Sequence, residues 1–283
     1  MKLRDVKLIL NKLGVSPDRR LGQNFLIDNN IIKKIITKSE LLKDDIILEI
    51  GPGLGALTEK LVEKVKKVYA IEIDPRLCSY LEKKFLEYDN IDIINADILN
   101  LDLPIHNKVV SNIPYSITGP IFEKIFYNSN PPEGIMIIEK KIVDRIFYNG
   151  NYENFSRITV SFNAFMKLKN NFFVSRNCFF PIPNIDLSLI KISPREEINQ
   201  FLLNDDNKNF FLKFIAGIMP YKNKNLLNAL ELFLKNNKII KFNKLRINQI
   251  LQTNKYNNIK VFRLKIEEFI ELSKLFSNLN EKI

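Results

Sequence analysis

The chain has 283 residues, of which 46 % are hydrophobic and 11 % aromatic, enough for one large core with an appendage or for two domains. A net charge of +11 favours a polyanionic partner, nucleic acid ahead of a membrane surface, with a merely solubilising charge excess as the alternative. No apolar run approaches the roughly 18 residues of a membrane span, and one histidine with two cysteines far apart, Cys78 and Cys178, argues against a zinc site and a disulfide.

Apolar runs and helical periodicity alternate along the first half of the chain. Helical spacing predicts helices over 3–13, 29–38, 57–66, 75–87 and 120–127, and short apolar runs predict strands over 46–50, 68–72, 91–94, 108–111 and 134–138. Asp28 and Asp74 stand at expected N-caps. Strands that alternate with helices in this way predict an α/β fold with a parallel, doubly wound sheet.

The second half of the chain changes character. After a helix over 156–165, alternating runs over 167–174 and 186–192 predict an antiparallel hairpin that closes the sheet. Residues 193–197 are the expected linker, and helical periodicity follows over 208–219, 224–235, 243–251 and 266–279. From residue 193 onward, 16 lysines and arginines face nine aspartates and glutamates, a net charge of +7. We therefore expect two domains, 1–192 and a basic helical domain over 193–283.

A glycine turn, Gly51-Pro52-Gly53-Leu54-Gly55, directly follows the first parallel strand. Glycines lack the Cβ atoms that would keep a ligand away from the backbone, so the turn is suited to a nucleotide. With Ala56, and with an acidic residue about 20 positions on, it also satisfies the loose dinucleotide fingerprint. The turn alone therefore leaves open a nicotinamide site, a methyl-donor site or a tight turn without a ligand.

Polar residues mark the ends of the next three strands. Glu72, Asp97 and Asn112 each stand at or just after a strand end. Parallel sheets bind their ligands at the carboxyl ends of the strands, so these side chains are expected to converge with the glycine turn on one site.

The segment Asn112-Ile113-Pro114-Tyr115 suits chemistry on the exocyclic amine of a nucleic-acid base. Such an amine is a poor nucleophile because its lone pair is delocalised into the ring. The amide oxygen of Asn112 and a carbonyl just before or at Pro114 can accept the two amine hydrogens and localise that pair. Tyr115 offers a face for stacking, at about 1–3 kcal/mol per base. A plain proline turn is the structural alternative.

Six segments stand in unbroken order: 22–26 (GQNFL), 49–55 (EIGPGLG), 71–74 (IEID), 95–97 (NAD), 112–115 (NIPY) and 179–188 (FFPIPNIDLS). Together they resemble the KsgA/Dim family of ribosomal-RNA adenine dimethyltransferases. The resemblance implies a Rossmann-like S-adenosylmethionine-dependent methyltransferase sheet with a C-terminal helical domain. It also implies S-adenosyl-L-methionine as the cofactor and no metal.

The resemblance assigns cofactor roles to residues along these segments. The backbone at Gly51, Gly53 and Gly55 would approach the methionine and ribose parts, Glu72 would accept both ribose hydroxyls, and Asp97 with Ile98 would meet the adenine. Gln23, Asn24 and Leu26 would cross the methionine end, where Asn112 also lies.

It further assigns Asn112, Pro114 and Tyr115 to catalysis, with Phe179 as a second aromatic that clamps the base against Tyr115. Phe180 is adjacent, and a core position for Phe179 is the alternative. Ser116 and Gly119 are small residues expected near the base.

Two departures from the family pattern matter. Ile113 replaces the usual Leu and is shared with the Erm antibiotic-resistance methylases. The basic segment over 221–230 has fewer arginines than expected, and we take its Lys222 and Lys224 as candidate phosphate contacts.

We therefore expect dimethylation of two adjacent adenines in the 3′-terminal hairpin of small-subunit rRNA, by a cytoplasmic monomer that acts on the pre-small ribosomal subunit. Pro120 and the long basic helical region favour this reading over an Erm-type large-subunit methylase. A nicotinamide oxidoreductase, one alternative, would explain the glycine turn and Glu72 but would give the 112–115 segment no function. A non-catalytic RNA-binding assembly factor is the other alternative.

Overall fold

The computed structural model describes residues 2–18, 22–148, 152–237, 244–256 and 258–280. Contacts divide the chain into two compact units, a first unit of residues 1–144 and 166–194 and a second unit of residues 145–165 and 195–283. Residues 145–165, which the expected boundary at 192/193 places with the sheet, thus group with the second unit. The expected linker over 193–197 begins inside a strand. The assignment of separate functions to two domains stays a prediction.

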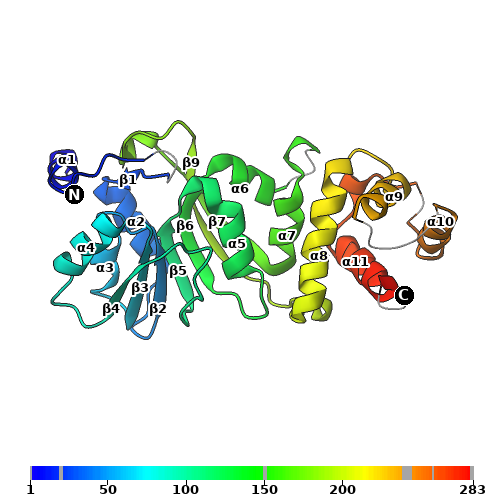
Figure 1. The fold of residues 1–283 in the computed structure, drawn as a ribbon, viewed down its shortest axis with the longest axis horizontal. Helices are drawn as coiled ribbons and strands as arrows, with labels where there is room; N and C mark the ends of the chain where they lie inside the picture. Colours follow the sequence, from blue (N-terminus) through cyan, green and yellow to red (C-terminus); the bar gives the residue numbers. More distant parts are fainter. Residues whose placement is uncertain (1, 19–21, 149–151, 238–243, 257, 281–283) are drawn as a thin grey trace. The chain divides into compact units, whose positions relative to one another are not determined.

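The first unit contains a sheet of seven strands in the order β4-β3-β2-β5-β6-β9-β7 (Figure 1). The five predicted strands pair in parallel, and the predicted hairpin adds two antiparallel strands beyond β6, so the α/β fold is confirmed. The strands are β2 (Ile46–Ile50), β3 (Lys67–Glu72), β4 (Ile91–Asn95), β5 (Lys108–Asn112), β6 (Glu133–Glu139), β7 (Met166–Val174) and β9 (Leu187–Pro194).

Five N-terminal helices begin within two residues of their predicted starts, and a further helix over 140–146 was not predicted. They are α1 (Leu3–Lys12), α2 (Asn29–Ser39), α3 (Thr58–Leu61), α4 (Pro75–Lys84), α5 (Thr118–Phe126) and α6 (Lys140–Ile146). Asp28 and Asp74 cap α2 and α4 by accepting backbone N–H groups, as expected. The helix expected over 57–66 is shorter, because the carbonyls of Val62 and Val65 accept hydrogen bonds from the Asn90 side chain in a turn.

A second, two-stranded sheet was not predicted. β1 (Phe25–Leu26) pairs antiparallel with β8 (Phe179–Phe180), which places Leu26 opposite Phe179. Strands of two residues, more than 150 positions apart, carry no periodicity that sequence reading can detect. The pairing brings the 22–26 segment beside the 179–188 segment.

The second unit is helical, as expected. Its helices are α7 (Arg157–Phe165), α8 (Asp205–Ile218), α9 (Leu226–Asn237), α10 (Lys244–Thr253) and α11 (Ile266–Asn280). The buried ring of Phe214 packs edge-on against Phe233 and is stacked on Phe276, which joins α8, α9 and α11.

One-turn 3₁₀ helices occur in both units. They cover Tyr115–Ile117, Tyr152–Asn154, Arg176–Cys178, Gln200–Leu203, Met219–Tyr221 and Val261–Arg263.

Cys78 and Cys178 are both free and buried, as expected for packing thiols. Within the described part of the chain, no helix is long and apolar enough to cross a membrane.

Candidate active site

A cavity opens at the carboxyl ends of the parallel strands of the first unit. The glycine turn after β2, the ends of β3 and β5, the residues after β4 and the 22–26 segment all contribute to its lining. The sequence-predicted residues that line it are Gln23, Asn24, Leu26, Gly51, Gly53, Glu72, Asp97, Ile98, Asn112 and Pro114. Gly55, Tyr115 and Phe179 do not belong to this lining.

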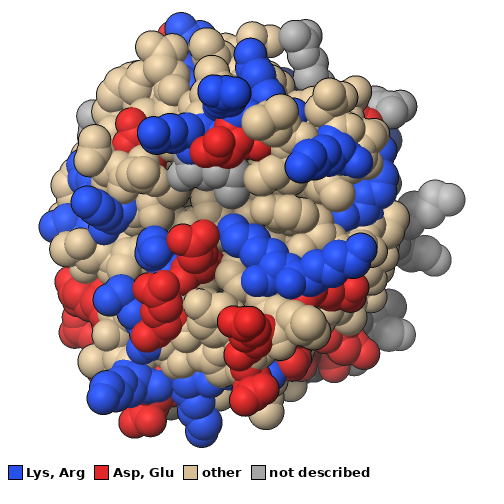
Figure 2. Space-filling model, turned by 90° about the vertical axis from the view of Figure 1, so that its left-hand side faces the viewer, with Lys and Arg blue, Asp and Glu red and all other residues tan. Residues whose placement is uncertain are grey.

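The charge of the lining is entirely acidic. Among the described residues that form it, the ionisable side chains are Glu49, Glu72 and Asp97, without lysine, arginine or histidine. Burial raises the pKa of Glu49 to about 8, so this residue adds no full charge at neutral pH. The outer face around α1 and α4 carries both signs of charge side by side (Figure 2). Carboxylates attract hydroxyl and cationic groups and repel phosphates, so this lining fits a sulfonium cofactor better than the pyrophosphate of a dinucleotide. In the described residues, no three carboxylate, histidine or cysteine side chains gather as a metal site.

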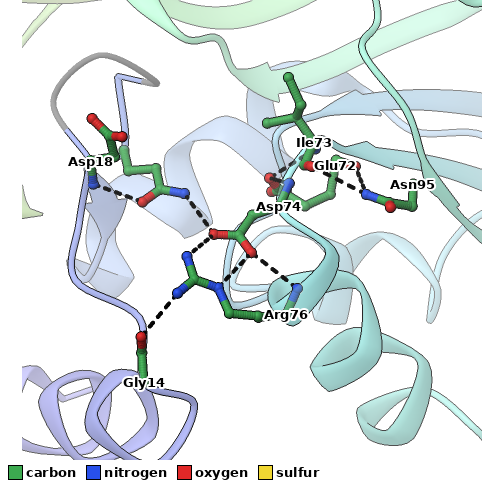
Figure 3. Close-up of polar contacts among 8 residues, drawn as sticks. Gly14, Asp18, Glu72, Ile73, Asp74, Arg76 and Asn95 are labelled. Atoms are coloured by element: carbon green, nitrogen blue, oxygen red, sulfur yellow. Dashed lines mark hydrogen bonds and ion pairs between the residues drawn. The ribbon is translucent and has the colours of Figure 1, made fainter.

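Glu72 is held rigidly at the end of β3. Its carboxylate accepts the backbone N–H groups of Ile73 at 3.0 Å and Asp74 at 3.1 Å in the turn into α4 (Figure 3). It also accepts the Gly53 N–H at 3.1 Å. Burial raises the pKa of this carboxyl, an effect that the three donors oppose. The geometry fixes Glu72 between the glycine turn and α4, where a ribose hydroxyl can reach its remaining acceptor sites.

The three glycines of the turn serve two purposes. Gly51 and Gly53 have φ values of +65° and +60° and line the cavity, so both need glycine and both let a ligand meet the backbone. Gly55, with φ +73°, faces the core instead: a Cβ there would lie 2.8 Å from Phe85 and 2.9 Å from Leu81. Packing explains the glycine at 55, whose predicted contact with the cofactor stays a prediction.

Asp97 lies in the turn after β4. Its carboxylate accepts the backbone N–H of Leu99 at 2.9 Å and the side-chain amide of Asn100 at 3.0 Å, which orients it beside the buried Ile98. Both residues line the cavity, as expected for contacts with an adenine.

The amide of Asn112 has a defined orientation at the end of β5. Its Nδ2 donates to the Asn24 carbonyl at 3.0 Å, so its Oδ1 is turned the other way and meets the Tyr115 hydroxyl at 3.4 Å. Burial raises the pKa of Tyr115, which keeps the phenol protonated as the donor. Asn112 therefore presents an acceptor oxygen at the edge of the cavity.

Pro114 stiffens the wall next to Asn112. A Cβ at Gly22 would lie 3.4 Å from the proline ring and one at Gly51 would lie 3.7 Å from it, so both glycine segments lie beside the ring at ordinary contact distance. The positive φ values of the two residues, +64° and +65°, favour glycine there. The Pro114 carbonyl accepts the Ile117 N–H at 3.2 Å in the turn that follows. Ser116 lines the cavity, whereas Gly119 does not.

The two phenylalanines of the 179–188 segment belong to different clusters. Phe179, 1 % exposed, joins the main core of the first unit, against which Tyr115 packs. Phe180 packs instead against the cluster beneath α1 and lies under the Lys7 ammonium, 5.3 Å from the ring centroid. Phe179 belongs to the cluster against which Tyr115 packs, which favours it over Phe180 as the second aromatic, whereas its burial matches the core alternative. The clamp therefore stays a prediction.

Sequence reading missed several residues of the lining. Glu49 opens the glycine segment, yet we gave it no role; it is 1 % exposed, accepts the Thr58 hydroxyl at 2.7 Å, and burial raises its pKa to about 8. Ile73, 47 % exposed, also lines the cavity. The available sequence signal was an apolar residue directly after the strand-end acid Glu72. Val6 of α1 also lines the cavity, and no local motif points to it.

Within the second unit, one of the two candidate phosphate contacts already has internal partners. The Lys222 ammonium donates to the carbonyls of Tyr152 at 3.1 Å and Phe155 at 2.6 Å and lies 4.3 Å from the centroid of the Tyr152 ring. Desolvation and the nearby Arg145 lower its pKa. Lys222 thus makes internal contacts, whereas Lys224 is exposed.

The doubly wound sheet, the acidic strand-end cavity and the 112–115 turn together define an S-adenosylmethionine-dependent methyltransferase. The family model described as "Ribosomal RNA adenine dimethylase" matches residues 16–271. The chain belongs to this family.

Similar proteins agree with that placement. The ribosomal RNA small subunit methyltransferase A of Natranaerobius thermophilus is 30 % identical, covering 97 % of this chain and 96 % of that protein, and that of Bacillus pumilus is 35 % identical, covering 94 % of each. Among solved structures, a dimethyladenosine transferase from Plasmodium falciparum has a TM-score of 0.75 and 25 % identity, covering 91 % of this chain and 98 % of that one. The 23S rRNA methyltransferase ErmE has a TM-score of 0.61 and 26 % identity, with 89 % and 98 % covered.

Proposed function

We propose that this chain transfers methyl groups from S-adenosylmethionine to N6 of two adjacent adenines in the 3′-terminal hairpin of small-subunit rRNA. The observation that carries the proposal is the Asn112 amide, whose orientation is set by the Asn24 carbonyl so that Oδ1 remains available as an acceptor beside an acidic cavity. Ribosome biogenesis is the setting, with the pre-small ribosomal subunit as partner.

The cofactor supplies an activated methyl group when bound, and residues of this chain fit its parts. Glu72 and Asp97 offer acceptors for ribose hydroxyls and an adenine amine, and the backbone at Gly51 and Gly53 is open to contact. No metal is needed for this fit, since the lining itself carries the charge that complements a sulfonium.

Asn112 and the turn after it act on the target amine. The Asn112 Oδ1 accepts one amine hydrogen. A carbonyl just before or at Pro114 accepts the second; the Pro114 carbonyl already accepts the Ile117 N–H but, like Asn112 Oδ1, keeps a second lone pair. Two acceptors localise the nitrogen lone pair, an arrangement that lowers the barrier through orientation and electrostatics. Tyr115 provides the stacking face.

The substrate RNA separates two related activities. The similarity to ErmE, together with Ile113, gives weight to a large-subunit RNA as the second candidate. The relatives named for small-subunit methylation and the position of Pro120 favour the small subunit. We propose that the chain acts on this partner in the cytoplasm, as a monomer.

Methyl incorporation and primer extension test the proposal together. Tritiated methyl groups should enter small-subunit rRNA, and extension on RNA from cells that lack and then regain the gene should show restored stops in the 3′-terminal hairpin. A restored stop in the large subunit alone would assign the Erm-type activity. RNA binding without any incorporation would assign the assembly-factor role.

A further inference from the structure

Arg76, at the start of α4, joins two parts of the first unit that lie far apart in the sequence. Its Nε and Nη2 donate to the two carboxylate oxygens of Asp74 at 3.0 and 2.7 Å, and its Nη1 donates to the Gly14 carbonyl at 2.9 Å (Figure 3). Such a planar fork fixes orientation as well as charge. Arg76 thereby ties the end of α1 to the end of β3.

Asp74 also contacts Gln23, which follows Gly14 by nine positions in the chain. The Gln23 amide donates to Asp74 Oδ2 at 3.5 Å, and its oxygen accepts the Asp18 N–H at 2.9 Å. The backbone of Gln23 donates to the Asp18 carbonyl at 3.2 Å. Asp74, whose side chain is 4 % exposed, is thus the common partner of Arg76 and Gln23.

The segment held in this way forms one wall of the cavity. Residues 22–26 line it, and Val6 of α1 adds to the same lining. Asn24 fixes the Asn112 amide, and the Asp74 N–H donates to the Glu72 carboxylate at 3.1 Å. Asp74 therefore contacts both Glu72, the expected ribose ligand, and Gln23 in the cavity wall. Neither Arg76 nor Asp74 lines the cavity itself.

A surface ion pair that does nothing else is the alternative, since exposed pairs contribute little to stability. The Arg76 side chain is indeed half exposed, at 51 %. An isolated pair would not, however, also donate to a carbonyl 62 positions away and share its carboxylate with a cavity-lining glutamine.

We propose that Arg76 is a positioning residue for the cofactor site, acting through Asp74 and Gln23 to hold residues 22–26 as the cavity wall. The inference rests on the proposed function of that cavity.

Binding of S-adenosylhomocysteine, measured by calorimetry, tests the role without relying on turnover. Arg76→Ala should weaken binding about three- to tenfold, and Arg76→Lys, which keeps the charge but not the fork, should lose less. The matched control is Lys67→Ala, because Lys67 forms an equally short ion pair with Asp92 (2.7 Å) beside the opposite end of β3. It should bind like the parent. Amide exchange in peptides covering residues 14–26 should accelerate in Arg76→Ala but not in the control.

A double-mutant cycle identifies the route. If Arg76 acts through Gln23, the double variant Gln23→Ala with Arg76→Ala should bind no more than about twofold worse than the weaker single variant. Fully additive losses, or parental affinity in Arg76→Ala, would overturn the inference alone. If Arg76→Ala fails to fold, Arg76→Lys replaces it in the test. Parental affinity and parental amide exchange in Arg76→Lys would then overturn the inference. A parent protein that binds no S-adenosylhomocysteine would overturn the cofactor assignment, and with it this inference.

Discussion

The cavity of the first unit is lined by carboxylates, whereas the segment over 221–230 of the second unit carries lysines. The carboxylate of Glu72 is buried and supported by three backbone N–H groups, yet it still faces a cavity. Lys222 is only partly buried, but two carbonyls take up its ammonium.

This difference shows that charge is available to a ligand only where the protein leaves part of the group unsatisfied. Carboxylates have about four acceptor sites and can be held by the backbone while keeping one free. An ammonium has three donors. Lys222 donates two of them to carbonyls, and its nitrogen also lies over the Tyr152 ring. Side chains at strand ends are therefore better candidates for ligand contacts than lysines taken from a helix sequence.

The largest effect is expected for Asn112→Ala. We expect methyl transfer to fall about 100- to 1000-fold, because an acceptor aimed at the transition state is lost, while S-adenosylhomocysteine binding changes only severalfold. Tritiated-methyl incorporation and calorimetry measure the two quantities. Asn170→Ala, at an exposed asparagine of β7, is the control and should behave like the parent. Transfer at the parental rate in Asn112→Ala would show that the strand-end amide is not part of the chemistry.

Glu49 provides the next largest effect, on stability. In the unfolded chain it ionises near pH 4.5, whereas in the folded state it keeps its proton to about pH 8. The folded state binds one more proton between these values, so the free energy of unfolding should fall as pH rises, by up to about 1.4 kcal/mol per pH unit, and level off above pH 8. Denaturant titrations at pH 5 to 9 measure this slope. Glu49→Gln should flatten it, and an unchanged slope in that variant would rule out Glu49 as the source.

The sheet and its strand ends were predictable because two regularities coincide. Apolar runs and helical spacing give the α/β alternation, and a parallel sheet brings the residues after its strands to one edge, so Glu72, Asp97 and Asn112 could be placed together before any coordinates. The six-segment resemblance supplied the cofactor and the reaction.

Other features depend on contacts that sequence spacing does not encode. The β1 and β8 pairing, the contribution of Val6 and the link from Arg76 to Gly14 all join positions far apart in the chain. The Lys222 contacts arise because residues 152–155 group with the second unit, which no local pattern indicated.

Glu72→Ala should weaken S-adenosylhomocysteine binding at least tenfold, about 1.4 kcal/mol. The change removes the acceptor for ribose hydroxyls and leaves three backbone N–H groups without their carboxylate. Glu72→Gln keeps one acceptor oxygen, so its affinity should lie between those of the parent and Glu72→Ala. Glu87→Ala, at an exposed position of the first unit, should bind with the parental affinity. Calorimetry with NADH in parallel sharpens the result, since binding of NADH without S-adenosylhomocysteine would contradict the acidic-lining argument.

The smallest effects separate the two lysines of the basic segment. Lys224→Ala should reduce the slope of log binding constant against log salt by about 1 if it contacts a phosphate, with unchanged stability. Lys222→Ala should leave the slope unchanged and lower the free energy of unfolding by about 1–2 kcal/mol, because the Tyr152 and Phe155 carbonyls lose a charged donor. Filter binding to the small-subunit hairpin over a salt series, with denaturant titrations of both variants, measures the pair. Because the two lysines are two residues apart on the same segment, equal changes in the salt slope would show that Lys222 leaves its internal contacts for RNA. That result would remove the contrast between the two regions.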